Sequence, residues 1–215
     1  MVARPTRGHA GIRWVCHHPP VAQGVTLEPR PPPSRAGPSL LAVGTIVWLA
    51  SELMFFGGLF AAYVTLRANS RVWLPHAVHL ETAAAAIATV LLIASSGTIH
   101  LAGKARERGD RVGMQRWMII TLALGVVFVA NQIREFFVLD FSASSSGFAS
   151  MYYIMTGFHA LHVFAGLLLI IAAVVVTMSA KDFERRAPVA ESVTYYWHFV
   201  DVVWILLFLT LFVIR

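Results

Sequence analysis

Five long apolar stretches dominate the sequence, and short polar segments separate them. A helix needs about 20 mostly apolar residues to cross the roughly 30 Å hydrocarbon core of a bilayer. Each stretch is long enough, so the pattern predicts helices at about residues 41–66, 77–102, 117–139, 151–178 and 194–214. The predicted fold class is therefore all-α, an integral membrane bundle of five transmembrane helices.

Residues 1–39 differ from the rest of the chain, because they are rich in proline and arginine. Such a segment buries too little apolar surface to offset the entropy of ordering, so it is expected to form a disordered N-terminal tail. The tail holds the single cysteine, Cys16, but no ligand spacing typical of a metal site. We therefore divide the chain into this tail and a helical domain at residues 40–215.

Charge is scarce and unevenly distributed. Charged residues make up 13% of the chain, against about 25% in a typical soluble domain. The net charge of +6 forms no basic stripe with interleaved aromatic residues, which argues against nucleic-acid binding. Thirteen of the 17 Lys and Arg residues fall in the tail and in the second and fourth connecting loops. The positive-inside rule then places the N-terminus in the cytoplasm and the C-terminus outside.

Glu52 lies in the middle of the first apolar stretch, far from any other charged residue in the sequence. A charged side chain at the centre of a bilayer costs about 2.5–3.5 kcal/mol on insertion scales, so such a residue is usually neutralised or paired. Two interpretations stay open: a proton-linked or lipid-contacting functional site, and a neutral acid that is hydrogen-bonded to a neighbouring helix.

The last two apolar stretches each carry a pair of polar residues on one helix face. His159 and His162 are three residues apart, as are His198 and Asp201. In antiparallel helices, a rise of about 1.5 Å per residue puts His162 and Asp201 at similar depth, where the imidazole could donate to the carboxylate. The alternative is a metal or haem site, but His159 and His198 would be roughly 10 Å apart along the membrane normal. The spacing therefore favours an interhelical polar network without a metal.

Other residues add to this picture. Gln132 and Glu135 of the third stretch are expected to join the polar network toward the outer surface, and His100 is expected at the cytoplasmic interface. The Gly57-Gly58 pair and Gly166 predict close helix contacts. No nucleophile with its base and no Gly-rich phosphate loop appears. The residues alone predict a bundle that supports a partner.

Several motifs resemble the cytochrome c oxidase subunit III family, and they occur in order along residues 43–215. They are ELMFF at 52–56, GDR at 109–111, QIRE at 132–135, GFHALHV at 157–163 and WHFVDVVW at 197–204. Mitochondrial members of that family have seven helices, so this chain is similar to the shorter bacterial form. Residues 43–60 are most similar to actinobacterial members.

The resemblance implies a core subunit of an aa3-type cytochrome c oxidase in a bacterial plasma membrane. The family assists assembly, stability and proton uptake of the catalytic subunit I and carries no haem or copper itself; haem a and copper lie in partner subunits. The implied partners are oxidase subunits I and II, membrane phospholipid and, indirectly, cytochrome c or a cytochrome bc complex. By resemblance, Glu52 is a buried carboxyl group, while Trp197 and Trp204 pack against lipid or neighbouring helices.

The chain departs from the family pattern in two places. A histidine pair at the end of the second helix is replaced by Gly103-Lys104, and two N-terminal helices that form one wall of the family's lipid cleft are missing. A quinol oxidase subunit III and a homologue associated with nitric oxide reductase share the motifs and are alternatives. A stand-alone transporter would need a polar pathway, and the sequence shows neither repeats nor broken helices.

Overall fold

The computed structural model describes residues 40–70, 73, 81–179 and 183–214. The chain divides after Gly37 into two units, and all described residues belong to the second, Pro38–Arg215. The predicted tail at residues 1–39, with Cys16, lies outside the described residues, so its disorder stays a prediction.

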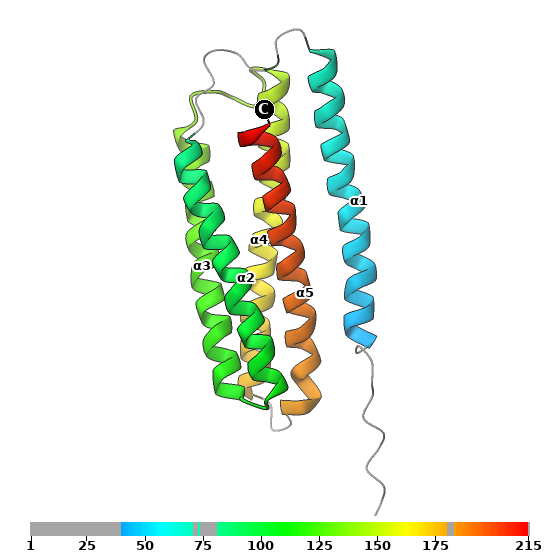
Figure 1. The fold of residues 1–215 in the computed structure, drawn as a ribbon, viewed down its shortest axis with the longest axis vertical. Coiled ribbons are helices and arrows are strands. Elements are labelled where there is room, and N and C mark those ends of the chain that lie inside the picture. Colours follow the sequence, from blue (N-terminus) through cyan, green and yellow to red (C-terminus); the bar gives the residue numbers. More distant parts are fainter. Residues whose placement is uncertain (1–39, 71–72, 74–80, 180–182, 215) are drawn as a thin grey trace, which may run out of the picture. The chain divides into compact units, whose positions relative to one another are not determined.

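Five antiparallel helices make up the described chain (Figure 1). They are α1 (Leu40–Asn69), α2 (Thr82–Glu107), α3 (Arg111–Val138), α4 (Gly147–Ser179) and α5 (Phe183–Phe208), and the π-helix η1 (Leu209–Val213) continues α5. The described residues include five helices that are long and apolar enough to cross a membrane. The predicted all-α fold class is confirmed.

Several helices extend beyond the apolar stretches from which their boundaries were predicted. α2 continues to Glu107, α3 begins at Arg111 rather than at 117, and α5 begins at Phe183 rather than at 194. Hydropathy marks where the chain enters hydrocarbon, but a helix continues for as long as its backbone groups pair internally. The 26 residues of α2 span about 39 Å, so roughly six of them project beyond a hydrocarbon core of about 30 Å.

A tight turn joins α2 to α3, and its sequence explains its geometry. Gly109 has a φ of 70°, a conformation that glycine adopts without steric cost. The N–H groups of Gly109 and Asp110 donate to the carbonyls of Arg106 and Ala105, both at 2.9 Å, which closes α2 in a Schellman motif. The Asp110 carboxylate then accepts the N–H of Gly113 at 2.8 Å and caps α3.

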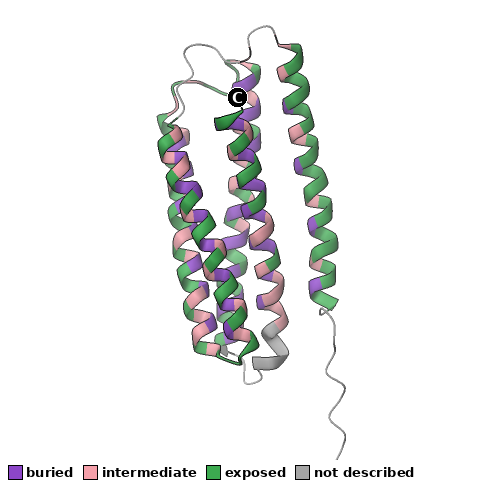
Figure 2. Cartoon of the chain, viewed as in Figure 1, coloured by how far each residue is buried: buried purple, intermediate pink, exposed green. Residues whose placement is uncertain are grey.

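The core lies among α2, α3, α4 and α5, and α1 packs against α4 and α5 (Figure 2). The buried residues of α1 recur every seventh position, and they are Ala42, Leu49, Phe56 and Tyr63. Such spacing gives only a narrow contact seam along the helix. Most of the α1 surface is therefore apolar and exposed, and Met54 and Val47 are examples.

Candidate functional site

A membrane-embedded acid and a histidine meet where α1 packs against α4. His162 Nε2 lies 3.2 Å from Glu52 Oε2, and His162 Nδ1 lies 2.7 Å from the carbonyl oxygen of Phe158, one turn earlier on α4. Both side chains are only partly covered, at 22% exposed for Glu52 and 13% for His162. The two residues form a polar pair within otherwise apolar helices, and we call them the Glu52–His162 pair.

The hydrogen bonds determine how many protons the Glu52–His162 pair holds. A carbonyl can only accept, so His162 Nδ1 carries a proton. If the ring is neutral, Nε2 is an acceptor and Glu52 must be protonated to donate to it. If the ring is an imidazolium, Nε2 donates to a Glu52 carboxylate. In both states the pair shares one further proton and is neutral overall, which avoids the cost of an isolated charge in hydrocarbon.

Aromatic rings surround the pair and fasten α1 to the bundle. The Phe56 ring lies edge-on to His162 at 5.1 Å, and the Phe55 ring lies edge-on to Phe158 at 5.0 Å. Trp48 stacks on Tyr196 at 5.5 Å, and the Tyr196 hydroxyl donates to the His162 carbonyl at 2.9 Å. These rings pack around the pair, while part of both side chains stays exposed at the bundle surface.

Removing one member of the pair should cost more than removing both. We expect His162→Leu to destabilise the chain by about 1–3 kcal/mol, because Glu52 loses its hydrogen-bond partner. The double variant Glu52→Leu/His162→Leu should be more stable than His162→Leu alone. Thermal unfolding in detergent measures both, and equal melting temperatures for the single and double variants would contradict this pairing.

The two tryptophans of α5 are buried against neighbouring helices, so neither contacts lipid. Trp197 is 0% exposed and Trp204 is 1% exposed. Both indole N–H groups donate to hydroxyls of α2, Trp197 to Ser95 at 2.9 Å and Trp204 to Thr89 at 3.0 Å. Trp197 and Trp204 were predicted to pack against lipid or neighbouring helices, and in the structure they pack against neighbouring helices.

Small residues make room for the Trp197 indole. A Cβ at Gly125 of α3 would lie 2.6 Å from Trp197 Cη2, and one at Gly166 of α4 would lie 3.1 Å from the same ring. The prediction of a close contact at Gly166 is confirmed. Among the described residues no such contact forms at Gly57-Gly58, because both glycines are exposed on α1 and a Cβ there would meet nothing within 4 Å.

The predicted hydrogen bond between His162 and Asp201 is wrong. His162 contacts Glu52 of α1, whereas Asp201 is buried on α5 and interacts with Ser96 of α2. Neither Asp201 oxygen makes a hydrogen bond of good geometry within the described chain. Equal depth along two antiparallel helices does not put two side chains on facing sides, and these two point to different neighbours.

The other residues predicted to form the polar network each contact different neighbours. His159 stacks on Trp204 at 4.9 Å, and its ring nitrogens have no partner among the described residues. His198 Nδ1 lies 2.7 Å from the Ser96 hydroxyl. On the far end of the bundle, the Tyr152 hydroxyl donates to Glu135 at 2.7 Å.

Gln132 lies one turn before Glu135 on α3 and is buried. Its Nε2 has no hydrogen-bond partner within the described residues. The predicted residues therefore occupy several helix seams rather than one continuous network. Across residues 40–70, 73, 81–179 and 183–214, no group of three or more His, Cys, Asp or Glu side chains is placed to hold a metal ion.

Comparison with known proteins identifies the family of this chain. The sequence pattern of the family described as cytochrome c oxidase subunit III matches residues 35–214. The chain belongs to the cytochrome c oxidase subunit III family. A probable cytochrome c oxidase subunit 3 of Nocardia farcinica is 45% identical over 182 residues, which cover 83% of this chain and 90% of that protein.

Two further members of the subunit III family are similar over nearly the same share of this chain. Cytochrome c oxidase subunit 3 of Corynebacterium diphtheriae is 44% identical over 184 residues, covering 83% of this chain and 90% of that protein. That of Thermostichus vulcanus is 39% identical over 178 residues, covering 82% and 89%. The resemblance to actinobacterial members is confirmed by the Nocardia and Corynebacterium proteins.

In this member of the subunit III family, the hydroxyl partners of α5 were missed by the sequence analysis. On α2, Thr89 forms a hydrogen bond with Trp204 and Ser95 forms one with Trp197. Ser96 forms one with His198. The signal was present, because the Ser95-Ser96 pair lies in the middle of an apolar helix. Polar residues in hydrocarbon-spanning helices commonly hydrogen-bond across helix seams.

Proposed function

We propose that this chain is the third subunit of an aa3-type cytochrome c oxidase and carries no redox centre. It supports the assembly, stability and proton uptake of the subunit that reduces O2 to water and pumps protons. Its membership of the subunit III family supports this proposal, as do relatives that are named for the same oxidase.

The Glu52–His162 pair is the observation that carries the proton-uptake part of the proposal. It is a protonatable pair inside the apolar span, 3.2 Å apart, and its shared proton shifts between the two side chains without a change of net charge. Its partial exposure at the bundle surface gives a neighbouring subunit or lipid access to it. A pair of this kind can pass a proton to a partner as another proton arrives, so that no net charge remains in hydrocarbon after the exchange.

The surroundings of the histidines support a role without haem or copper. His162 is engaged with Glu52 and Phe158, and His198 with Ser96. His159 lies beside the rings of Trp204 and Phe128, at 4.9 and 6.0 Å. Because the three imidazoles face different neighbours, they do not converge on one cofactor.

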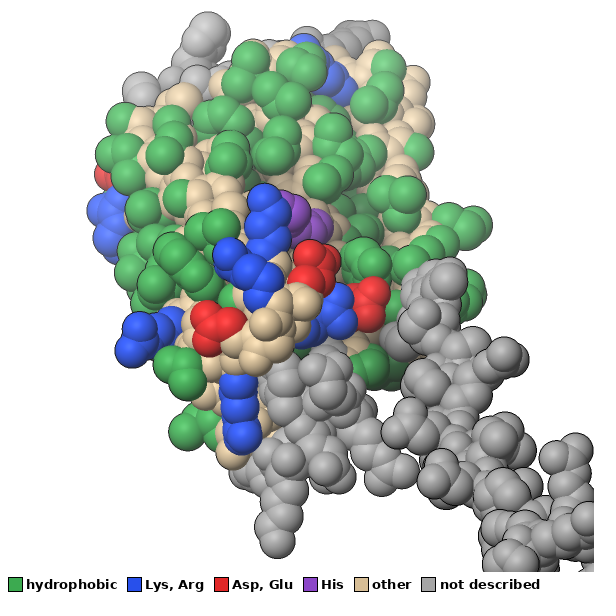
Figure 3. Space-filling model, turned by 60° about the horizontal axis from the view of Figure 1, so that its bottom comes forward, with side chains coloured by type: hydrophobic (Ala, Val, Ile, Leu, Met, Phe, Trp, Pro, Cys, Tyr) green, Lys and Arg blue, Asp and Glu red, His purple; other side chains and the backbone are tan. Residues whose placement is uncertain are grey.

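The surface of the helices supports a position in the bacterial plasma membrane among oxidase subunits I and II and phospholipid. The outward face of α1 is apolar. Figure 3 looks onto the end of the bundle that holds the α2–α3 turn, where Lys and Arg side chains gather. Those of the described residues are Lys104, Arg106, Arg108, Arg111 and Arg116. By the positive-inside rule, this charge supports a cytoplasmic position for this end and for the start of α1.

The proposed role is tested on the purified oxidase with and without this chain. Both forms should reduce O2 at first, because the redox centres belong to other subunits. The form without the chain should lose activity sooner during turnover, and its rate should fall more steeply as pH rises. Identical inactivation and identical pH profiles would contradict the role in stability and proton uptake.

Glu52 should react with an apolar carbodiimide, a reagent that modifies protonated carboxyl groups within lipid. In the neutral-ring state of the pair, Glu52 carries the shared proton and faces the bundle surface. A peptide map of treated membranes should show the label on Glu52, and the Glu52→Gln variant should show no label on that peptide. Unlabelled Glu52 in the native protein would contradict the protonated state.

A further inference from the structure

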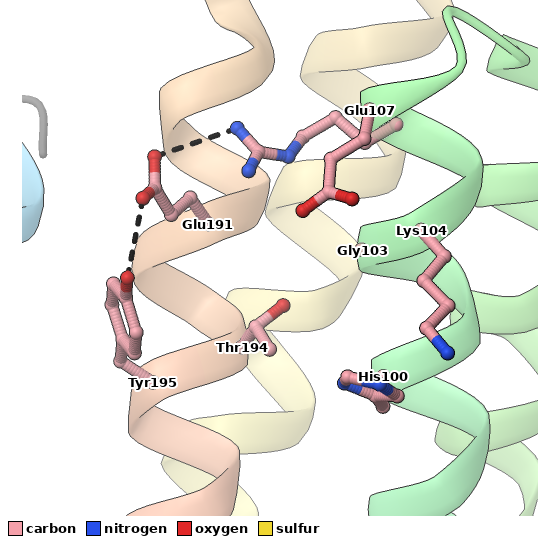
Figure 4. Close-up of a pocket in the computed structure, with 8 residues that line it drawn as sticks. His100, Gly103, Lys104, Glu107, Glu191, Thr194 and Tyr195 are labelled. Carbon is pink, nitrogen blue, oxygen red and sulfur yellow. Dashed lines mark hydrogen bonds and ion pairs between the residues drawn. The ribbon is translucent and has the colours of Figure 1, made fainter. Parts of the chain in front are cut away.

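A pocket of about 230 Å³ lies where the end of α2 meets the start of α5, away from the Glu52–His162 pair. α2 contributes His100, Lys104 and Glu107, and α5 contributes Glu191, Thr194 and Tyr195. In Figure 4, Glu107 points from α2 toward α5, and Thr194 points back toward α2. A cavity needs only about 10–15 Å³ of such volume to hold one water molecule, so this pocket has room for a small polar group.

The walls of the pocket present both signs of charge. Arg106 Nη1 lies 3.4 Å from Glu191 Oε2, and the Tyr195 hydroxyl donates to Glu191 at 3.3 Å, so this wall is internally paired. Arg106 Nε is buried without a hydrogen-bond partner among the described residues. Lys104 and Glu107 are exposed and form no ion pair within the described part of the chain. The pocket therefore offers cationic donors and a separate carboxylate acceptor.

The position of the pocket corresponds to the headgroup layer of a membrane. Lys104 and Glu107 lie in the last turns of α2, in the part that projects beyond a hydrocarbon core of about 30 Å. Tyr195 is partly exposed at the rim, where amphipathic aromatic residues favour the membrane interface.

An apolar lane leads from the pocket toward the centre of the span. Gly97 and Ile93 precede His100 by three and seven residues, so all three share one face of α2. Both are exposed, and a Cβ at Gly97 would meet nothing within 4 Å. Because Gly97 has no side chain, an acyl chain can lie against the backbone on this face of α2.

We propose that this pocket binds a phospholipid headgroup that contains both a phosphate and a primary amine. The phosphate accepts from Lys104 and the ammonium donates to Glu107, while the acyl chains lie along Gly97 and Ile93. A soluble phosphoethanolamine has the same polar chemistry without the chains. The site consists only of residues of this chain, so it stands independently of the proposed respiratory role.

The test measures lipid binding to the full chain, purified with any subunits that remain bound and depleted of lipid in detergent. Native mass spectrometry follows the titration with phosphatidylethanolamine, phosphatidylcholine and phosphatidylglycerol. One bound lipid should prefer phosphatidylethanolamine. Lys104→Gln should weaken that binding about tenfold, because a charge-assisted hydrogen bond is lost. Glu107→Gln should remove the preference over phosphatidylglycerol, which has no amine.

Arg116→Gln is the matched control, because Arg116 is an exposed cation of α3 outside the pocket lining. It should bind phosphatidylethanolamine as the native chain does. Native-like binding by Lys104→Gln, or an equal loss in Arg116→Gln, would overturn the site. Soluble phosphoethanolamine that competes as strongly as the lipid would overturn the role of the acyl lane and of a membrane lipid as the ligand.

Discussion

Gly125→Leu is expected to remove the folded chain from the membrane almost completely. A Cβ added at this position would lie 2.6 Å from Trp197 Cη2 and 2.7 Å from Leu167 Cδ2. Overpacking a well-packed core typically costs about 1–3 kcal/mol and sometimes more. We therefore expect Gly125→Ala to lower the melting temperature and Gly125→Leu to prevent accumulation, as measured by thermal unfolding and by membrane yield.

Two controls separate this clash from a general effect of replacing helical glycine. A Cβ at Gly97 or at Gly157 would meet nothing within 4 Å, so alanine at either site should be tolerated. The double variant Gly125→Ala/Trp197→Phe should recover part of the loss, because a phenyl ring does not reach as far as an indole. Equal destabilisation by all three single alanine substitutions would refute the close contact with Trp197.

Trp204→Ala is expected to destabilise the chain by about 3–5 kcal/mol, the usual cost of truncating a buried tryptophan. The indole is 1% exposed and contacts Phe128 edge-on at 4.7 Å and His159 at 4.9 Å. Its N–H also donates to Thr89 at 3.0 Å, so its removal disrupts α2, α3 and α4 together. Thermal unfolding of the purified protein measures the loss.

Thr89→Val isolates the hydrogen bond from the packing of Trp204. It leaves the indole N–H buried without an acceptor, at an expected cost of about 1–3 kcal/mol. Thr65→Val is the control, because the Thr65 hydroxyl is exposed and donates only to the Ala61 carbonyl of its own helix. If both threonine variants unfold at the native temperature, the Trp204–Thr89 bond contributes nothing to stability.

The sequence was sufficient for the helices and for the faces on which the polar residues lie. Hydrophobic length predicted five spans, because lipid requires long apolar helices whose backbone groups pair internally. Trp197 and Trp204 are seven residues apart, a spacing that aligns two side chains on one face of a helix. Both indoles lie against α2.

The partners of the polar residues could not be predicted in the same way. His162 and Asp201 share a depth, but the rotation of α4 and α5 turns His162 to Glu52 and Asp201 to Ser96. Rotation depends on how side chains pack between helices, and the Trp197 indole packs here against Gly125 and Gly166. The depth of a residue follows from counting residues along its helix. The neighbouring helix to which its side chain points depends on the packing of the whole bundle.

The reduced-minus-oxidised visible spectrum of the tagged chain tests the central claim most directly. The spectrum is recorded after purification in mild detergent and again after the partner subunits have been stripped away. A chain that belongs to an oxidase without carrying its redox centres should copurify with haem absorbance in mild detergent and lose it on stripping. Haem retained by the isolated chain, or no haem in either sample, would contradict the account.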